Sequence, residues 1–145
     1  MAVCRFSDQS LVVVSIDLEA PLAGHDGDCI GAAGAVIEAI KRYEIPATWG
    51  IADPVHSRWT ERLLGKSFPC EIAILGDTSW IGGEAGRGQF SQELSRRVLH
   101  ARAAGLDVST LLPRETILDD HLDLVVKYGI VAVRGQVDAD GRSRR

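Results

Sequence analysis

The fold is decided by a segment close to the amino terminus, LVVVSIDLE at residues 11–19. Its apolar part, residues 11–16, is rich in β-branched side chains and lacks the alternation of a strand with one exposed face. This pattern is typical of a parallel strand covered on both faces, so we expect a central strand of a sheet here. Asp17 and Glu19 stand at the end of that strand.

The rest of the chain repeats the pattern of a short apolar strand followed by a helix. Expected strands lie at residues 47–52, 71–75, 106–112 and 130–133, and expected helices at residues 30–43, 55–64, 89–104 and 116–128. Asp28 is a suitable N-cap for the first helix, and a glycine-rich loop covers residues 76–88. Strict alternation predicts an α/β fold with about five parallel strands joined by right-handed crossovers.

Length and composition restrict the class of protein. The chain has 145 residues, 46% of them hydrophobic and 25% charged, which suits one globular domain and excludes general disorder. We expect this domain at residues 1–135 and a disordered polar tail at residues 136–145. The net charge of −4 lacks the basic excess that a nucleic-acid partner requires.

Neither a membrane span nor a signal peptide is expected, because the longest apolar run is far shorter than the ~20 residues of a transmembrane helix. We therefore expect a soluble, cytoplasmic protein without a membrane partner. Cys4, Cys29 and Cys70 are odd in number and lack close CxxC spacing, so we expect reduced, structural thiols.

Candidate site residues follow from one rule: ligands of parallel α/β sheets bind at the carboxyl ends of the strands. The rule selects the polar side chains after the five expected strands: Asp17, Glu19, Asp53, His56, Asp77, Thr78, Ser79, Trp80, Arg114, Glu115 and Arg134. Asp17 and Glu19 are two residues apart, so we expect them on one side of the strand, either for acid or base catalysis or as a merely polar strand end. Trp80, in the glycine-rich loop, is placed to stack on a sugar or to close a lid.

Other residues have structural interpretations. His100 and His121 fall in expected helices, away from the ligand face, as surface or packing residues. Trp49 and Trp59 are expected in the core. No GxGxxG or GxxxxGK[ST] segment occurs, which disfavours dinucleotide and P-loop nucleotide sites. Four neighbouring residues offer atoms that could bind a metal, namely His25, Asp26, Asp28 and Cys29. Most of these residue types also favour turns and helix caps, so we expect a solvated turn there rather than a metal site.

The order of these segments resembles the NodB-type polysaccharide deacetylases, carbohydrate esterases with a distorted (β/α) barrel. The matching segments are VVVSIDLE at residues 12–19, RYEIPATWGIAD at 42–53, EIAILGDTSW at 71–80 and DLVVKYGIVAVR at 123–134. The family has a TFDDG strand at the first of these, YGIPATFFV at the second and EIGSHTxxH at the third. The Ile-Pro-Ala-Thr segment, residues 45–48, is the most specific match.

The resemblance implies a catalytic base at Asp17 but no metal centre. In the family, a second aspartate of the first motif and two histidines hold a divalent metal, which activates water against an acetamide. Leu18, Leu75 and Ser79 stand at these three positions, and leucine cannot coordinate a metal. Of the family's Arg-x-Pro motif, only Pro113 is kept in place. We therefore expect a deacetylase-like pseudoenzyme without a bound cofactor.

The chain is also shorter than the ~200 residues of a complete (β/α) barrel. We accordingly expect an incomplete NodB-like (β/α) barrel of about five parallel strands, with a flavodoxin-like doubly wound sheet as the alternative. The open edges of an incomplete barrel lead us to expect self-association.

Three functions remain open at this point. The first is a non-catalytic cleft for a carbohydrate or small metabolite, with Asp17 at the base position and binding residues Glu19, Asp53, Asp77, Ser79, Trp80 and Arg134. The second is an active hydrolase of amide bonds in N-acetylated sugars, with magnesium or manganese held by a rearranged set drawn from Asp17, Glu19, Asp77, His25 and His56. The third is a flavodoxin-like or receiver-like interaction module, in which Asp17 and Asp77 form an acidic pocket.

Overall fold

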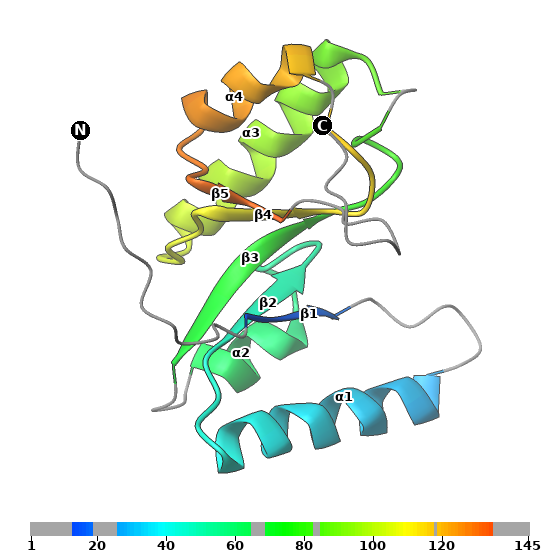
Figure 1. The fold of residues 1–145 in the computed structure, drawn as a ribbon, viewed down its shortest axis with the longest axis vertical. Coiled ribbons are helices and arrows are strands. Elements are labelled where there is room, and N and C mark those ends of the chain that lie inside the picture. The colour runs from blue at the N-terminus through cyan, green and yellow to red at the C-terminus, as the bar shows by residue number, and fades with distance from the viewer. Residues whose placement is uncertain (1–12, 19–25, 65–68, 83–84, 118, 135–145) are drawn as a thin grey trace, which may run out of the picture.

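The computed structural model describes residues 13–18, 26–64, 69–82, 85–117 and 119–134. Within them, one sheet of five parallel strands alternates with helices, which confirms the predicted α/β fold (Figure 1). The strands are β1 (Val14–Leu18), β2 (Ala47–Ile51), β3 (Cys70–Gly76), β4 (Thr110–Pro113) and β5 (Ala132–Val133). The helices are α1 (Asp26–Arg42), α2 (Arg58–Leu64), α3 (Arg87–Ala103), the 3₁₀ turn η1 (Asp119–His121) and α4 (Leu122–Lys127).

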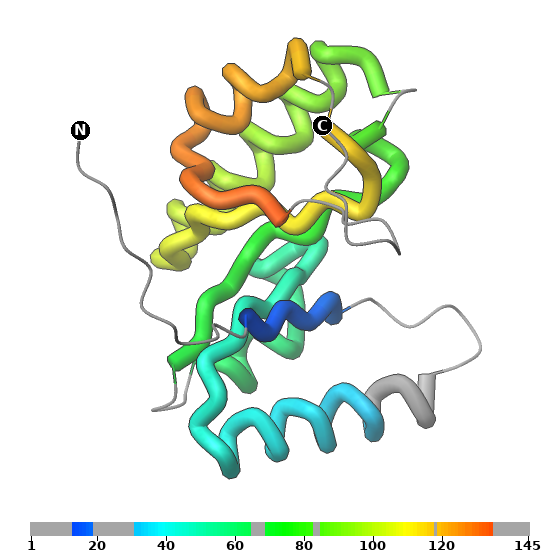
Figure 2. Tube along the Cα trace, viewed as in Figure 1, coloured from blue at the N-terminus to red at the C-terminus, as the bar shows by residue number. Residues whose placement is uncertain are grey.

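The strands lie in the sheet in the order in which they occur in the chain, β1-β2-β3-β4-β5, as the tube in Figure 2 traces from blue to red. A flavodoxin-like sheet has the order 2-1-3-4-5, so that alternative is wrong. The prediction of a central first strand is also wrong, because β1 lies at an edge of the described sheet and pairs with β2. An apolar run indicates a strand, but its length and composition do not report how many neighbours the strand has.

The helices pack on one face of the sheet. Side chains from all four helices and from the strands form a single hydrophobic cluster, which includes Ile37 of α1, Leu63 of α2, Leu94 of α3 and Val125 of α4. Sequential parallel strands with right-handed crossovers place every helix on the same side, which explains this arrangement. In Figure 1, α1 lies beside β1 and β2, and α3 and α4 lie next to β4 and β5.

The opposite face of the sheet, called the second face below, carries no described helix. Successive strand residues point to opposite faces, so the neighbours of the core residues Ile16, Trp49, Ile72 and Leu111 point to this side. The second face consists of Ser15, Asp17, Thr48, Gly50, Glu71, Ala73, Leu75, Thr110 and Leu112. Ala73, Leu75 and Leu112 form a small buried cluster there, and most of the others are polar.

Several element boundaries differ from the sequence prediction. Helix α1 begins at Asp26 rather than at residue 30, so Asp28 lies inside the helix instead of capping it. Helix α2 begins at Arg58 rather than at residue 55, because residues 54–56 form a turn held by Asp53. Strand β4 begins at Thr110, and the preceding residues 106–109 are not strand. Burial of Leu106 and Val108 gives that segment its strand-like pattern.

The expected tail at residues 136–145 lies outside the described residues. No helix in the described part of the chain is both long enough and apolar enough to cross a bilayer. The expected core positions of Trp49 and Trp59 are confirmed, since their exposed fractions are 0% and 5%.

Helix α3 supplies a matched pair of positions for testing the core. Leu94 is fully buried, whereas Leu99 on the same helix is 60% exposed. We expect Leu94→Ala to lower the free energy of unfolding by about 2–5 kcal/mol, because it removes buried methyl groups and leaves a cavity. Leu99→Ala should change it by less than about 0.5 kcal/mol. Urea unfolding followed by circular dichroism measures both values, and equal losses in the two variants would contradict the packing of α3 on the sheet.

Candidate functional site

An ion pair joins the two edges of the described sheet. Arg134, the residue after β5, donates from Nη1 to Oδ1 of Asp17 at 2.7 Å and from Nη2 to Oδ2 at 2.9 Å. The Nη1 group also donates to Oγ of Ser15 at 3.0 Å. The backbone N–H of Arg134 donates to the carbonyl of Leu111, so Arg134 is still held against β4 while its side chain reaches β1.

This contact requires a strongly curved sheet. Neighbouring strands lie about 4.8 Å apart, so the first and fifth strands of a flat sheet would be about 19 Å apart, beyond the reach of an arginine side chain. The second face is therefore the concave face, and Asp17 and Arg134 lie within it. Their side chains are 28% and 33% exposed, so the ion pair is accessible from solvent. The structure thus brings together two predicted site residues that are 117 positions apart in the chain.

The surroundings of Asp17 are mainly apolar on one side. A Cβ atom on Gly50 would lie 2.8 Å from Cδ1 of Leu112 and 3.2 Å from Oδ1 of Asp17, so only glycine leaves room for both groups at this point. Leu75 and Leu112 are buried beside it. Both oxygens of Asp17 already accept hydrogen bonds from Arg134. A ligand that reaches Asp17 must therefore share it with the guanidinium group.

A second polar group on the concave face was not predicted from the sequence. Glu71 of β3 accepts a hydrogen bond from Oγ1 of Thr48 at 2.8 Å, and its other oxygen accepts one from Oγ1 of Thr110. These three side chains come from the neighbouring strands β2, β3 and β4, near their amino ends. The sequence places Glu71 at the start of a strand, and only the strand register shows that it lies beside Thr48.

Asp77 and Ser79 follow β3 and interact mainly with their own loop. Oδ1 of Asp77 accepts hydrogen bonds from the backbone N–H of Ser79 at 2.9 Å and from the Ser79 hydroxyl. The carbonyl of Ser79 accepts a hydrogen bond from Nε2 of Gln89, at the start of α3. Both predicted binding residues thus stabilise the β3–α3 connection, in the pattern of an Asx-turn.

Trp80 lies in the core instead of closing a lid. Its exposed fraction is 1%, its ring lies 5.8 Å from the ring of Phe90, and the guanidinium of Arg97 lies 5.2 Å from its centroid. A Cβ on Gly76 would clash with the side chain of Ile81 and lie 3.4 Å from Trp80, so the glycine lets this loop fold back on the strand. The ring therefore has no face open to a sugar. Glycine content indicated a loop but not the direction of its aromatic residue.

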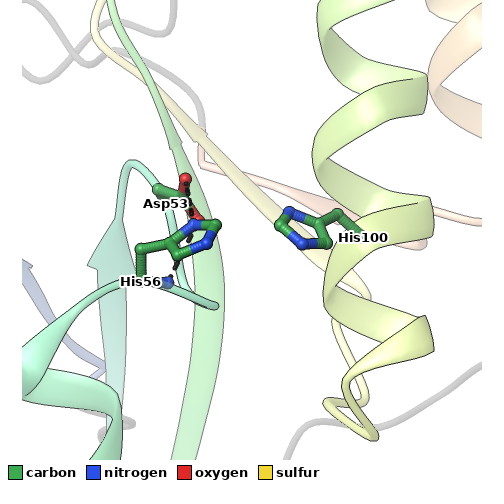
Figure 3. A group of neighbouring side chains, drawn as sticks. All are labelled: Asp53, His56 and His100. Carbon is green, nitrogen blue, oxygen red and sulfur yellow. Dashed lines mark hydrogen bonds and ion pairs between the residues drawn. The ribbon is translucent and has the colours of Figure 1, made fainter.

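Asp53, His56 and His100 lie together at the carboxyl end of β2 (Figure 3). Oδ1 of Asp53 accepts hydrogen bonds from the backbone N–H groups of Val55 at 3.2 Å and His56 at 3.3 Å, and Oδ2 lies 3.0 Å from Nδ1 of His56. His100 of α3 faces His56, with ring centroids 5.1 Å apart. His100 is exposed, as expected of a surface residue, but it lies beside Asp53 and His56 rather than away from the carboxyl ends of the strands.

Electrostatics at Asp53 favour the ionised carboxyl group. Partial burial acts to raise its pKa, but the hydrogen bonds and charge of His56 together with the backbone of Val55 outweigh it, and the pKa is lowered from its ordinary 3.8. Because the folded-state pKa is depressed, the ionised group stabilises the fold above its ordinary pKa. That contribution is lost as the pH falls through the lowered value.

A cavity of 360 Å³ lies beside this group, on the helix side of β1 and β2. It is lined by Leu18, Ile51, Ala52, Asp53, His56, Ser57, Arg58 and Trp59. Leu18 and Ile51 alternate with Asp17 and Gly50 along their strands, so this cavity and the concave face lie on opposite sides of the sheet.

Some predicted residues lie outside the described part of the chain. Glu19 and His25 are among them, as are the side chains of Asp26, Asp28 and Cys29. His121 is a packing residue as expected, since it is 3% exposed and stacks on Phe90 with ring centroids 4.9 Å apart. Cys70 is a free thiol whose Sγ lies 3.8 Å from the carbonyl of Leu63.

Comparison of the chain with protein-family models, with curated proteins and with solved structures finds no match. Function is therefore inferred from the side-chain geometry and from the sequence resemblance.

The Asp17–Arg134 ion pair is tested by a double-mutant cycle with Asp17→Asn, Arg134→Gln and the double variant. We expect a coupling free energy of about 0.5–1.5 kcal/mol that falls with added salt, because the pair is bidentate but partly exposed. Urea unfolding of the four proteins at low and high salt measures it. The exposed pair Lys41 and Glu38 on α1, 3.1 Å apart, is the control and should show a coupling below about 0.5 kcal/mol. A coupling of zero for Asp17 and Arg134 would contradict the prediction that this ion pair stabilises the fold.

Proposed function

We propose that the chain is a NodB-like, deacetylase-related domain with an incomplete (β/α) barrel, which binds a carbohydrate or small metabolite on its concave face and lacks metal-dependent deacetylase activity. The sequential order of five parallel strands, the helices on one side and the curved sheet support the barrel part of this proposal. These are the features that an arc of a (β/α) barrel would have.

The observation that carries the proposal is the bidentate pairing of Asp17 with Arg134. Asp17 stands at the position that the resemblance assigns to the catalytic base. A base takes a proton through a lone pair directed at the water it activates, and Arg134 already occupies one lone pair on each oxygen of Asp17. The pairing therefore favours binding over catalysis.

The positions of the family's metal ligands support the same conclusion. Leu18 is buried among core residues on the helix side, and Leu75 is 2% exposed on the concave face. The Ser79 hydroxyl is bonded to Asp77. Two of these side chains have no donor atom and the third is engaged within its loop, so they are unsuited to hold a divalent metal ion beside Asp17.

The chemistry of the concave face suits a hydroxylated ligand. Asp17 supplies acceptors, Arg134 supplies donors, and both are partly exposed. Neighbouring hydroxyl groups of a sugar both donate and accept, so one pyranose edge matches a carboxylate next to a guanidinium. Glu71, Thr48 and Thr110 extend the polar surface along the strands. Of the residues predicted from the sequence, Asp17 and Arg134 carry this proposal, and Trp80 is excluded from it by burial.

Binding is tested by titrating the full chain with N-acetylglucosamine tetramer in a calorimeter. We expect saturable binding that Asp17→Asn and Arg134→Gln each weaken at least about tenfold, because each variant removes a charged hydrogen-bonding partner. Glu38→Gln is the control, since Glu38 is an exposed carboxylate on α1 with an ion pair to Lys41, away from the concave face. It should bind the tetramer as the unaltered protein does.

The same samples separate binding from catalysis. Incubation of the protein with the tetramer and added zinc, manganese or magnesium should release no acetate. Metal-dependent acetate release would contradict the proposal in favour of an active hydrolase. Absence of tetramer binding, or equal binding by all variants, would contradict the assignment of the concave face to carbohydrate.

A further inference from the structure

Three potential metal ligands from two distant segments meet at the carboxyl end of β2. Asp53 and His56 belong to the turn between β2 and α2, and His100 belongs to α3. One ligand atom from each lies within 4.8 Å of the other two (Figure 3). From this arrangement we propose that Asp53, His56 and His100 bind a single divalent transition-metal ion of the zinc class.

The distances suit such an ion. With ligand bonds of about 2.0–2.2 Å, the ligand atoms of a tetrahedral zinc site are about 3.3–3.6 Å apart. Oδ2 of Asp53 and Nδ1 of His56 are already 3.0 Å apart. The side chain of His100 is exposed, so a small rotation about its side-chain bonds brings its imidazole to the ion without disturbing the core.

The scaffold that presents these ligands is fixed by a neighbouring contact. Nη1 of Arg97 donates to the carbonyl of Ala52, the residue before Asp53. Arg97 precedes His100 by three residues, so both lie on the same face of α3. Arg97 itself is 13% exposed in its side chain and is paired with Glu93 at 3.4 Å. This contact and the core packing of α3 hold the helix against the β2–α2 turn, with His100 beside His56.

The ligand types select the metal. Two imidazoles and one carboxylate suit zinc, cobalt, nickel or copper, whereas magnesium and calcium prefer oxygen ligands alone. The nearby cations Arg96 and Arg97 are both paired with Glu93, which reduces their repulsion of a bound ion. Three protein ligands leave a fourth position for water or an oxygen ligand, and the adjacent 360 Å³ cavity provides space for it.

This site is separate from the proposed carbohydrate surface. The cavity beside it is lined by Leu18 and Ile51, which point to the helix side of the sheet, and Asp17 is not among its lining residues. It also differs from the metal centre implied by the family resemblance, whose positions are occupied by Leu18, Leu75 and Ser79. The two proposals therefore stand or fall independently.

Cobalt(II) is the probe, because its visible absorption reports coordination and a near-ultraviolet sulfur-to-cobalt band reports cysteine ligands. We expect the full chain, freed of metal by a chelator, to bind one Co²⁺ without a sulfur band, and added Zn²⁺ to displace it. His56→Ala and His100→Ala should each weaken Co²⁺ binding roughly 100-fold or more. Loss of a residue that only hydrogen-bonds to a metal ligand already lowers metal affinity about 10–100-fold, and loss of a ligand should lower it further. Gln92→Ala, an exposed change on α3, should leave binding unchanged.

Circular dichroism and the unfolding midpoint establish that each variant is folded, and His100→Gln provides a second substitution that keeps a polar side chain. The proposal is overturned if His100→Ala and His100→Gln bind Co²⁺ as tightly as the unaltered chain. It is equally overturned by a sulfur-to-cobalt band, which would assign the ion to cysteines, or by no binding of Co²⁺ or Zn²⁺ at millimolar concentration.

Discussion

The ion pair between Asp17 and Arg134 links the first strand of the described sheet to the residue after the last one. It can form only if the sheet curves, and the sheet can curve toward its second face only if no helix occupies that face. Sequential strand order satisfies this condition, because it places all four helices on the other side. A doubly wound sheet has helices on both faces, which would keep its two edges apart.

The hydrophobic pattern of the sequence is sufficient to predict the strands and helices of this fold. It is insufficient to predict which strands lie next to each other in the sheet. The β-branched run is a local property, as are the helical pattern of α3 and the apolar character of Trp49. The structure agrees with them over the described residues, with β1 at Val14–Leu18, α3 at Arg87–Ala103 and Trp49 buried. Strand order is a property of the connections, and periodicity carries no information on it. The apolar pattern therefore predicts the first strand but not its place, which is the edge of the described sheet rather than the centre.

For the candidate sites too, the sequence predicts which residues lie near the ends of strands but not which of them contact each other. The rule of strand carboxyl ends selects Asp17, Arg134, Asp53 and His56, and the structure places them at or just after the ends of β1, β5 and β2. It did not show that Asp17 and Arg134 bind each other, because that contact depends on curvature. His100 is not selected by this rule, since it approaches from helix α3, whose position depends on the packing of its buried side chains in the core and on the hydrogen bond from Arg97 to Ala52.

Two consecutive residues of β2, Gly50 and Ile51, face the two proposed binding sites on opposite sides of the sheet. Gly50 lies under the Asp17–Arg134 pair, and Ile51 points to the opposite face, where it lines the cavity beside Asp53. A sugar on the concave face and a metal ion at Asp53 would therefore share no ligand group. They would share the backbone of residues 50–53, which Arg97 holds against α3 through the carbonyl of Ala52. Two short connections join the sites: this segment at the end of β2, and Leu18, which follows Asp17 in β1 and lines the cavity beside Asp53 and His56.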